Sequence, residues 1–449
     1  MTPGLRRRLT SDGGGAGSVE MQVQRSGQRH GSLRHGDLWF GRVLLEIVES
    51  NAGCGCRDSL RRQSRHSFGC FARIGMHRRR GVRVGVRSPR EAHVHERRDY
   101  RRVLPALPGG SVHAFPVRPS EVTPMSLLIA GSIATDHLMS FGGKFADSLV
   151  VEQLDKLSVS FLVDDLEIRR GGCAANISFG LARMGLTPVL VGAVGEDFVD
   201  YRSWLERHGV DCDSVHVSAT LHTARFVCTT DTTMAQFASF YPGAMTEARL
   251  IELRPIVARV GTPDYVLIGP DDPVAMTRHT DECRQRGYRF VADPSQQLAF
   301  GDGTLIRGLI DQATVLFSNE YESHLIEQKT EWTRDEILSR VGTHVVTLGA
   351  QGVRIERAGA DPITVAACQV EAVEPTGVGD AFRAGFLAGL DWGCSMERSA
   401  QVGCTLAAYV VESVGTQEYT FTNTAFVKRL RTTYGDEAAD EVAAHLTRR

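Results

Sequence analysis

A glycine-rich turn at residues 374–390 has the clearest chemical potential in this chain; it reads Glu-Pro-Thr-Gly-Val-Gly-Asp-Ala-Phe-Arg-Ala-Gly-Phe-Leu-Ala-Gly-Leu. Gly377 and Gly379 allow a tight turn that directs successive backbone N–H groups outward. The first turn of the apolar helix that follows leaves such donors unpaired beside a partial positive charge, so an anionic group fits there. Asp380 is then either the cap of this helix or a base beside a phosphate cradle. A Gly-x-Gly at a helix start is common, and this segment alone supports both interpretations equally.

A second glycine pair, Gly171 and Gly172, leads into an apolar helical stretch that contains Asn176 and ends at Gly185. An apolar strand at 189–194 follows this stretch. Because glycine has no Cβ, the pair lets a ligand approach the backbone closely. Taken alone, Asn176 is more simply explained as a polar residue at a helix end. Its functional interpretation depends on the combination with the first segment.

The two segments, in this order, resemble the paired signatures of the ribokinase-like (PfkB) carbohydrate and nucleoside kinases. Within that family, four further segments resemble the adenosine kinases of mycobacteria and related actinobacteria: Gly131-Ser-Ile-Ala-Thr-Asp-His137, Ser160-Phe-Leu-Val-Asp-Asp165, Asp293-Pro-Ser-Gln-Gln-Leu298 and Ser413-Val-Gly-Thr-Gln-Glu418. The resemblance runs from Met125 nearly to the C-terminus. It implies a ribokinase-like fold and a phosphotransferase with an alcohol acceptor. The activity that it implies is an ATP-dependent adenosine kinase, which makes AMP in purine salvage.

By this resemblance, Asp380 takes the proton from the 5′-hydroxyl of the nucleoside, while the backbone N–H groups of Gly377, Val378 and Gly379 hold the phosphate. We expect the helix dipole to keep Asp380 ionised at neutral pH. An ordinary Asp pKa near 3.9 makes it a weak base. That weakness is acceptable because a loose phosphoryl-transfer transition state requires mostly positioning.

The sugar contacts implied by the resemblance begin with Asp136, which lies just past the first predicted strand, where a doubly wound sheet places ligand contacts. A carboxylate there can accept hydrogen bonds from both ribose hydroxyls. Without the resemblance, Asp136 is more simply an exposed turn residue. Gly172, Asn176 and Ser132 match the other sugar contacts of the family.

The purine pocket implied by the resemblance consists of Phe226 and Phe240 on a predicted hairpin and of Gln296 and Gln297 after the strand that ends at Asp293. Aromatic faces can stack a purine, and two amides can bind its edge. Taken singly, each Phe is more simply explained by packing. Their positions together favour adenosine over a bare sugar.

The ATP side is identified by the same resemblance, since no Walker lysine motif occurs in the chain. Glu322 is expected to hold Mg²⁺ through water, because Mg²⁺ prefers water and phosphate oxygens to many protein ligands. Glu374 stands where many relatives have an aspartate that helps to bind a monovalent cation, so K⁺ activation is in doubt. The residues predicted to bind ATP are Asn319, Thr347, Gly349, Gly352 and Thr376.

The elements that must position these residues alternate between short β-rich runs and amphipathic stretches. This order predicts an α/β fold with a doubly wound, mainly parallel sheet flanked by helices. Residues 223–241 depart from it and predict a hairpin. In the family that the chain resembles, such strands make a small lid, so the resemblance implies a small β lid from strands near 135–165 and 222–242. The predicted sheet strands are 127–130, 189–194, 265–268, 290–292, 315–317, 345–348 and 353–356, and the predicted helices include 198–208, 272–286 and 397–413.

Residues 1–124 differ in kind from the predicted kinase domain at 125–449. They hold 23 Arg, no Lys and 10 acidic residues, a balance of +13 against −15 for the remainder. Such a stretch could bind nucleic acid or an acidic surface, or target an organelle. It has no sustained helical or strand period and too little apolar surface to fold, so we expect disorder. A start codon misassigned upstream of Met125 is the simplest explanation, with a genuine basic tail as the alternative, and no nucleic-acid partner is expected.

Cysteine spacing indicates neither a metal site nor close disulfide pairs; Cys54 and Cys56 form the nearest candidate and lie in the extension. Seven cysteines after Met125 fit small thiols in a reducing cytoplasm. No run of apolar residues is long enough to cross a bilayer, so no membrane partner is expected. A homodimer formed through the lid strands is expected. The alternatives are a kinase of ribose, fructose or another nucleoside such as inosine, and a non-catalytic protein that binds nucleoside or nucleic acid.

Overall fold

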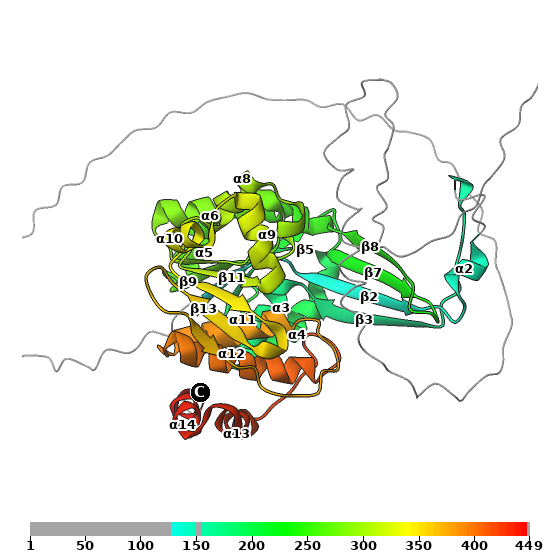
Figure 1. Ribbon diagram of the computed structural model, residues 1–449. Coiled ribbons are helices and arrows are strands. Elements are labelled where there is room, and N and C mark those ends of the chain that lie inside the picture. The colour runs from blue at the N-terminus through cyan, green and yellow to red at the C-terminus, as the bar shows by residue number, and fades with distance from the viewer. Residues whose placement is uncertain (1–126, 150–154, 447–449) are drawn as a thin grey trace, which may run out of the picture.

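The computed structural model in Figure 1 describes residues 127–149 and 155–446. The predicted extension at 1–124, including Cys54 and Cys56, lies outside the described residues. Eight strands form a central sheet in the order β14-β13-β12-β11-β10-β9-β1-β4. They are β1 Leu127–Ala130, β4 Val189–Val191, β9 Tyr265–Ile268, β10 Phe290–Ala292, β11 Val315–Asn319, β12 His344–Thr347, β13 Val353–Glu356 and β14 Ile363–Val365.

The strands from β4 to β12 in this order are parallel, and β13 and β14 add an antiparallel edge. In β1, Leu127 and Ile129 pack into the hydrophobic core on one face, and Leu128 and Ala130 pack into the core on the other. Both faces are therefore buried, which explains why the parallel strands are continuous apolar runs rather than alternating ones. The prediction of a doubly wound, mainly parallel α/β sheet is confirmed.

Helices cover both faces of this sheet (Figure 1). The core on one face includes residues of α3 Cys173–Arg183, α4 Val199–Arg207, α11 Val378–Asp391, α12 Met396–Val411, α13 Asn423–Tyr434 and α14 Asp436–Leu446, of which α13 and α14 lie beyond α12. The other packs against α5 Leu253–Val260, α6 Pro273–Arg286, α7 Gln297–Phe300, α8 Gly303–Ile310, α9 Glu320–Thr330 and α10 Arg334–Arg340. Short 3-10 helices are η2 Glu196–Phe198, η3 Gly243–Leu250 and η4 Gly349–Gln351.

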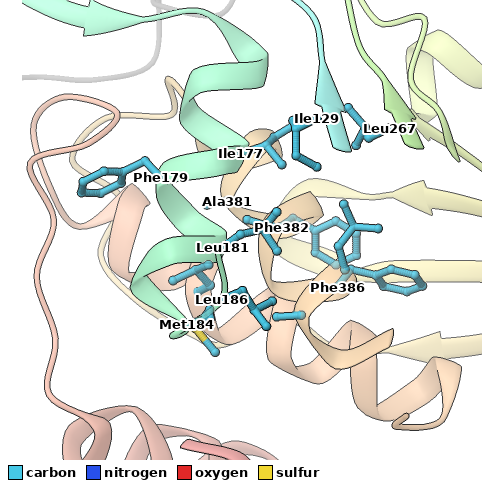
Figure 2. Packing of buried hydrophobic residues seen from close by; sticks show 14 of the residues in the cluster. Ile129, Ile177, Phe179, Leu181, Met184, Leu186, Leu267, Ala381, Phe382 and Phe386 are labelled. Atoms are coloured by element: carbon cyan, nitrogen blue, oxygen red, sulfur yellow. The ribbon is translucent and has the colours of Figure 1, made fainter. Parts of the chain in front are cut away.

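Figure 2 shows how α3 and α11 are held against the sheet. Ile177 of α3 lies beside Ile129 of β1 and Leu267 of β9. Phe382 and Phe386 of α11 pack into the same hydrophobic core. All five side chains are at most 4% exposed. Such dense packing leaves the N-terminal turns of both helices in fixed positions at the end of the sheet.

A separate four-stranded sheet, with the order β3-β2-β7-β8, extends from the end of the main sheet (Figure 1). We refer to this sheet as the lid. Its strands are β2 Ala134–Ser140, β3 Asp165–Gly171, β7 Ala224–Thr230 and β8 Gln236–Tyr241, with α2 Phe145–Ser148 near its tip. The strands β7 and β8 form the antiparallel hairpin that the alternation at 223–241 indicates. At its turn, the Asp231 carboxylate accepts hydrogen bonds from the backbone N–H groups of Phe145, Thr233 and Ala235.

The prediction of one strand over 189–194 is wrong. β4 ends at Val191, and the chain continues as β5 Ala193–Gly195, which pairs with β6 His216–Ser218 in a different sheet. Gly192 lies between them, where an added Cβ would be only 2.6 Å from the Gly131 carbonyl oxygen. The apolar run is therefore interrupted by a close backbone contact that hydrophobic pattern alone does not reveal.

Candidate functional site

A cavity of about 580 Å³ lies where the lid meets the ends of the main-sheet strands and the first turns of α3 and α11. Sixteen of the eighteen residues predicted as site residues line it; Val378 and Gly352 do not. Segments far apart in sequence therefore converge on one space. The sixteen are Ser132, Asp136, Gly172, Asn176, Phe226, Phe240, Gln296, Gln297, Asn319, Glu322, Thr347, Gly349, Thr376, Gly377, Gly379 and Asp380.

The start of α11 is set by Gly377, which is the N-cap residue and has a left-handed backbone with φ 78°. A Cβ at this position would lie 2.9 Å from the Thr416 side chain, so both the conformation and the space favour glycine. Asp380 lies in the first turn of the helix and does not cap it. The interpretation of Asp380 as the helix cap is therefore wrong, and its carboxylate is left to face the cavity.

Burial raises the pKa of Asp380 from 3.8 to about 6, against the opposing effects of its hydrogen bond from Asn176 and of the nearby Arg383 cation. The pKa is therefore higher than the ordinary Asp value that we expected, because this half-buried carboxyl is less well solvated than one in water. Asp380 is still ionised at neutral pH. It accepts a proton more readily than an ordinary aspartate does, which suits a general base.

Asn176 orients Asp380 through a buried hydrogen-bond network. Its Nδ2 donates to Asp380 Oδ2 at 2.8 Å, and its Oδ1 accepts from Thr416 Oγ1 at 3.0 Å and from Gln417 Nε2 at 2.9 Å. Because both ends of the amide are engaged, its orientation is fixed. Asn176 was predicted as a sugar contact; in this structure it lines the cavity and holds the carboxylate.

The network continues to the base of the lid. Gln417 Nε2 also donates to the Tyr201 hydroxyl at 2.6 Å, and that hydroxyl donates to the Gly171 carbonyl at 2.9 Å. Gly171 is the last residue of β3, and the next residue, Gly172, begins α3 with φ 92°. A Cβ at Gly172 would lie 2.6 Å from Ala134 N, so the lid strand and the helix meet at a point that only glycine fits.

Asp136 lies on β2, opposite Arg169 of β3 and Phe226 of β7. Burial raises its pKa from 3.8 to about 6; Arg169 lowers the pKa and Glu374 raises it. Ser132, before β2, accepts a hydrogen bond at its Oγ from Cys173 N at 3.0 Å and so stabilises the start of α3. Asp136 therefore offers acceptor oxygens on the cavity wall contributed by the lid.

Aromatic and amide side chains meet at the lid end of the cavity. Phe226 and Phe240 are directly paired across β7 and β8, and both line the cavity. Gln297 is 4% exposed and donates from Nε2 to the Asp271 carbonyl at 2.8 Å, while its Oε1 has no partner. Gln296 is more exposed and lies 3.8 Å from the Cys173 sulfur.

Asn319 and Glu322 line the other end of the cavity and also form the capping box of α9. Asn319 Oδ1 accepts from Glu322 N at 2.7 Å, and Glu322 Oε2 accepts from Asn319 N at 2.8 Å. Burial raises the pKa of Glu322. The structure thus gives this pair a local role in helix capping in addition to its position in the cavity.

Val378 and Gly352 occupy structural positions instead of cavity positions. The Val378 N–H donates to the Pro375 carbonyl at 3.3 Å, and its side chain packs against the hydrophobic core. A Cβ at Gly352 would lie 2.0 Å from the Val365 carbonyl oxygen, so this glycine is required by the turn between β12 and β13. Their predicted phosphate and ATP contacts have no counterpart among the residues that line the cavity.

Glu374 is engaged by protein groups. Its carboxylate accepts from Arg169 Nη1 at 3.0 and 3.2 Å and from Gly415 N at 3.0 Å. This ion pair ties the lid strand β3 to the loop before α11. The arrangement agrees with the doubt about a K⁺ site here, and K⁺ dependence stays a prediction.

The cavity residues that sequence reasoning did not predict include Asp271, Arg383 and Thr416. Burial raises the pKa of Asp271 to about 8, so its carboxyl retains a proton at neutral pH. Arg383 is 5% exposed although it is charged. A signal existed for Arg383, because it is the only charged residue between Asp380 and Asp391 in an apolar helix. Thr416 lies in the segment at 413–418, whose resemblance to the kinase family was a signal, whereas no comparable signal marks Asp271.

Three general features of the described residues bear on the sequence predictions. The seven cysteines after Met125 are all free thiols. No cluster of three or more His, Cys, Asp or Glu side chains that could hold a metal ion occurs in the described part of the chain. Within 127–149 and 155–446, no helix has the length and apolar character needed to cross a bilayer.

Comparison with known proteins assigns a class to this fold and site. The family model described as pfkB family carbohydrate kinase matches residues 136–423. The chain therefore belongs to the pfkB carbohydrate kinase family, and it is a phosphotransferase with an alcohol group as acceptor.

The relatives of this chain include nucleoside kinases and ribokinases. It is 28% identical over 315 residues to the nucleoside kinase of Methanothermobacter thermautotrophicus, covering 69% of this chain and 97% of the relative. Its identity to the ribokinase of Haemophilus influenzae is 23% over 303 residues, which cover 65% of this chain and 94% of the relative. The structure of Burkholderia thailandensis nucleoside kinase with inosine is similar, with 31% identity and a TM-score of 0.61. The match covers 69% of this chain and 99% of that one. The chain is thus a kinase of nucleoside-kinase and ribokinase type.

Proposed function

We propose that this protein is an ATP-dependent adenosine kinase that transfers the γ-phosphate of ATP to the 5′-hydroxyl of adenosine and forms AMP for purine salvage. The observation that carries the proposal is the convergence of the paired Phe226 and Phe240 with Asp136 and Asp380 on one cavity. Aromatic faces, a ribose-binding carboxylate and a buried base are the groups that phosphorylation of a purine nucleoside requires.

Asp380 removes the proton of the 5′-hydroxyl, and Asn176 keeps its carboxylate oriented through the 2.8 Å hydrogen bond. The N-terminal turn of α11, at Gly377 and Gly379, stabilises the negative charge on the transferring group. Asp136 accepts hydrogen bonds from the ribose hydroxyls and so aligns the acceptor.

The side chains at the end of the cavity that we assign to the purine favour adenine over hypoxanthine as the bound base. A backbone carbonyl can only accept a hydrogen bond, so the bond from Gln297 Nε2 to the Asp271 carbonyl identifies the donor end of the amide and leaves Oε1 as the acceptor without a partner. The unpartnered Gln297 Oε1 then accepts a hydrogen bond from the 6-amino group of adenine. Inosine carries a carbonyl oxygen at that position, which would place two acceptors against each other. The runner-up is nevertheless an inosine or sugar kinase, because a relative has been solved with inosine.

ATP binds as co-substrate at the end of the cavity lined by Asn319, Thr347, Gly349 and Thr376. Glu322 fits the role of a water-mediated Mg²⁺ ligand, because it offers a carboxylate to the cavity and Mg²⁺ needs few protein ligands. When bound, Mg²⁺ neutralises charge on the phosphates. We place the protein in the cytoplasm, where ATP and free thiols coexist.

The test of this function is a substrate panel of adenosine, inosine, ribose and fructose with ATP and Mg²⁺. We expect the highest kcat/KM for adenosine, with AMP as product. Preference for inosine or for a sugar would shift the assignment to the corresponding kinase. Tight binding of adenosine with no AMP formed would favour a non-catalytic nucleoside-binding protein.

The pH dependence of kcat/KM should report the two half-buried carboxyls, Asp136 and Asp380. Burial raises the pKa values of Asp136 and Asp380 to about 6, and both act in their ionised forms. Lowering the pH through 6 protonates both groups, so log(kcat/KM) for adenosine should fall with a slope approaching two. It should be level above about pH 7. The measurement is a profile at saturating ATP and Mg²⁺. Asp136→Asn should reduce the slope to one, and a level profile down to pH 5 would contradict the assignment.

The first 124 residues should be dispensable, because we propose that the kinase domain begins at Met125. Protein starting at Met125 is expected to match the full chain in thermal unfolding and in AMP formation. Mass spectrometry of the N-terminus of the protein from its own host completes the measurement. An inactive or insoluble truncated form, or native peptides from well upstream of Met125, would show that the extension belongs to the protein.

The outer face of the lid supports a homodimer. Leu166 and Ile168 of β3 are 52% and 59% exposed, and Phe237 and Tyr241 of β8 are 45% and 42% exposed. Alternation along the strands places these side chains on the face opposite Phe226 and Phe240. We expect light scattering coupled to gel filtration to show a dimer, and Ile168→Lys to yield a monomer. A monomeric wild type would contradict this proposal.

A further inference from the structure

We propose that Arg383 is a second catalytic residue, which donates hydrogen bonds to the γ-phosphoryl group of ATP during its transfer. This inference rests on the proposed function, since it concerns the same cavity and reaction. In that step, the 5′-oxygen forms a bond to the γ-phosphorus while the bond from that phosphorus to the bridging oxygen breaks. The hydroxyl proton passes to Asp380, and ADP leaves with the electron pair of the broken bond.

Arg383 is held rigidly beside the N-terminal turn of α11. Its Nη2 donates to Asp293 Oδ1 at 2.7 Å, and its Nε lies 2.5 Å from Asp293 Oδ2. Its Nη1 donates to the Gly379 carbonyl at 3.1 Å, and its guanidinium lies 5.4 Å from the centre of the Phe317 ring. The side chain of a helical residue points toward the N-terminus of its helix, which brings this guanidinium back to the turn that is proposed to hold the phosphate.

The guanidinium retains donors for a ligand. It has five N–H groups, and each Nη carries two of them. The contacts to Asp293 and Gly379 engage one hydrogen on each Nη. One further N–H remains on each Nη atom, and two such donors match the fork geometry with which arginine binds a phosphate. Arg383 lines the cavity, whereas its partner Asp293 does not.

The charge of the cavity makes Arg383 distinctive. Among the described residues that line it, Arg383 is the only one with a cationic side chain, against the carboxyl groups of Asp136, Asp271, Glu322 and Asp380. Burial alone would lower its pKa, but the attraction of Asp293 outweighs burial and raises it, so Arg383 stays charged. The chain has no Walker lysine to neutralise the transferring group. Arg383 is placed to supply that positive charge.

The alternative is that Arg383 and Asp293 form a buried ion pair of structural value only. Arg383→Met alone cannot decide between the two, because it leaves the 1%-exposed Asp293 carboxylate buried without its partner and destabilises the fold. The double variant Arg383→Met with Asp293→Asn removes both charges and is expected to restore the thermal midpoint. The matched control is Arg334→Met with Glu356→Gln, which removes another buried carboxylate and one of its two arginine partners outside the cavity.

We expect the double variant to melt near the wild-type temperature, while its kcat falls roughly 10²- to 10³-fold, as after loss of an oxyanion-hole donor. The KM for adenosine should change little, and the control should retain wild-type turnover. Calorimetric titration with ADP and with a non-hydrolysable ATP analogue provides a second measurement. Wild type should bind the analogue more tightly than ADP, because only the analogue carries a γ-phosphate, and the double variant should lose this preference.

Two results would overturn the inference: a double variant with wild-type turnover, or one that loses turnover but keeps the preference for the ATP analogue. The second result would assign Arg383 to the packing of α11. Failure of the proposed function looks different, because wild type would then phosphorylate no member of the substrate panel. The titrations with ADP and the ATP analogue would still show whether Arg383 contacts the γ-phosphate.

Discussion

Replacing Asp380 with asparagine should lower turnover with adenosine by roughly 10²- to 10⁴-fold, the range typical of general-base loss, while adenosine binding stays nearly unchanged. Asparagine preserves the shape of the side chain and an oxygen that can still accept the hydrogen bond from Asn176, so the network to Gln417 is retained. What the variant loses is the group that accepts the hydroxyl proton. Single-turnover kinetics and calorimetric titration with adenosine separate these two effects.

The matched control for this variant is Asp361→Asn, since Asp361 is an exposed residue outside the cavity. It should turn over adenosine like the wild type. Near-normal turnover of Asp380→Asn would show that another group accepts the proton or that none is needed. Loss of adenosine binding together with turnover would instead show that Asp380 shapes the sugar site.

Phe226→Ala and Gln297→Ala should each weaken adenosine binding. The loss of stacking on Phe226 is expected to cost about 1 to 3 kcal/mol, by analogy with the stacking of bases on aromatic side chains. Gln297→Ala removes the acceptor that we assign to the 6-amino group of adenine, so it should weaken adenosine more than inosine. The measurement is the Kd of each nucleoside by calorimetry, together with kcat/KM for both.

Phe237→Ala provides the control for Phe226, because Phe237 lies on the same hairpin but is 45% exposed and does not line the cavity. Its adenosine affinity should equal that of the wild type. If Phe226→Ala and Gln297→Ala both keep full affinity, and the wild type prefers ribose or fructose, the purine pocket is wrong and the sugar-kinase assignment replaces it.

Local sequence pattern was sufficient to predict where the parallel strands of the main sheet begin and where the two glycine turns lie, but it did not predict the edge strand β14. Apolar runs such as 265–268 and 290–292 have the same first and last residues as β9 and β10. Strands that are buried on both faces are continuous apolar runs, so the ends of the run mark the ends of the strand. Gly377 and Gly172 mark the starts of α11 and α3, since both need a left-handed backbone. These are properties of short segments.

Long-range contacts account for what sequence pattern did not reveal. The raised pKa of Asp380 depends on burial by helices distant in sequence, and Arg383 pairs with Asp293, 90 residues before it. The engagement of Asn176 by Gln417 joins residues 241 positions apart. The split of residues 189–194 depends on how closely Gly192 approaches Gly131. Such features follow from the packing of the whole domain, which periodicity and spacing do not encode.

The order of the chain separates the two ends of the cavity. The lid strands, with Asp136, Phe226 and Phe240, all precede residue 242, whereas the wall from Asn319 to α11 begins after residue 314. On the proposed assignment, the ribose contact and the stacking of the base are therefore encoded on a different stretch of the gene from the groups that contact the transferring phosphate, and Gln297 lies between the two stretches. Recombination or point mutation in the earlier stretch can change which alcohol is accepted and leave the later stretch intact. In this way, one ancestral phosphotransferase can give rise to descendants that phosphorylate different sugars and nucleosides.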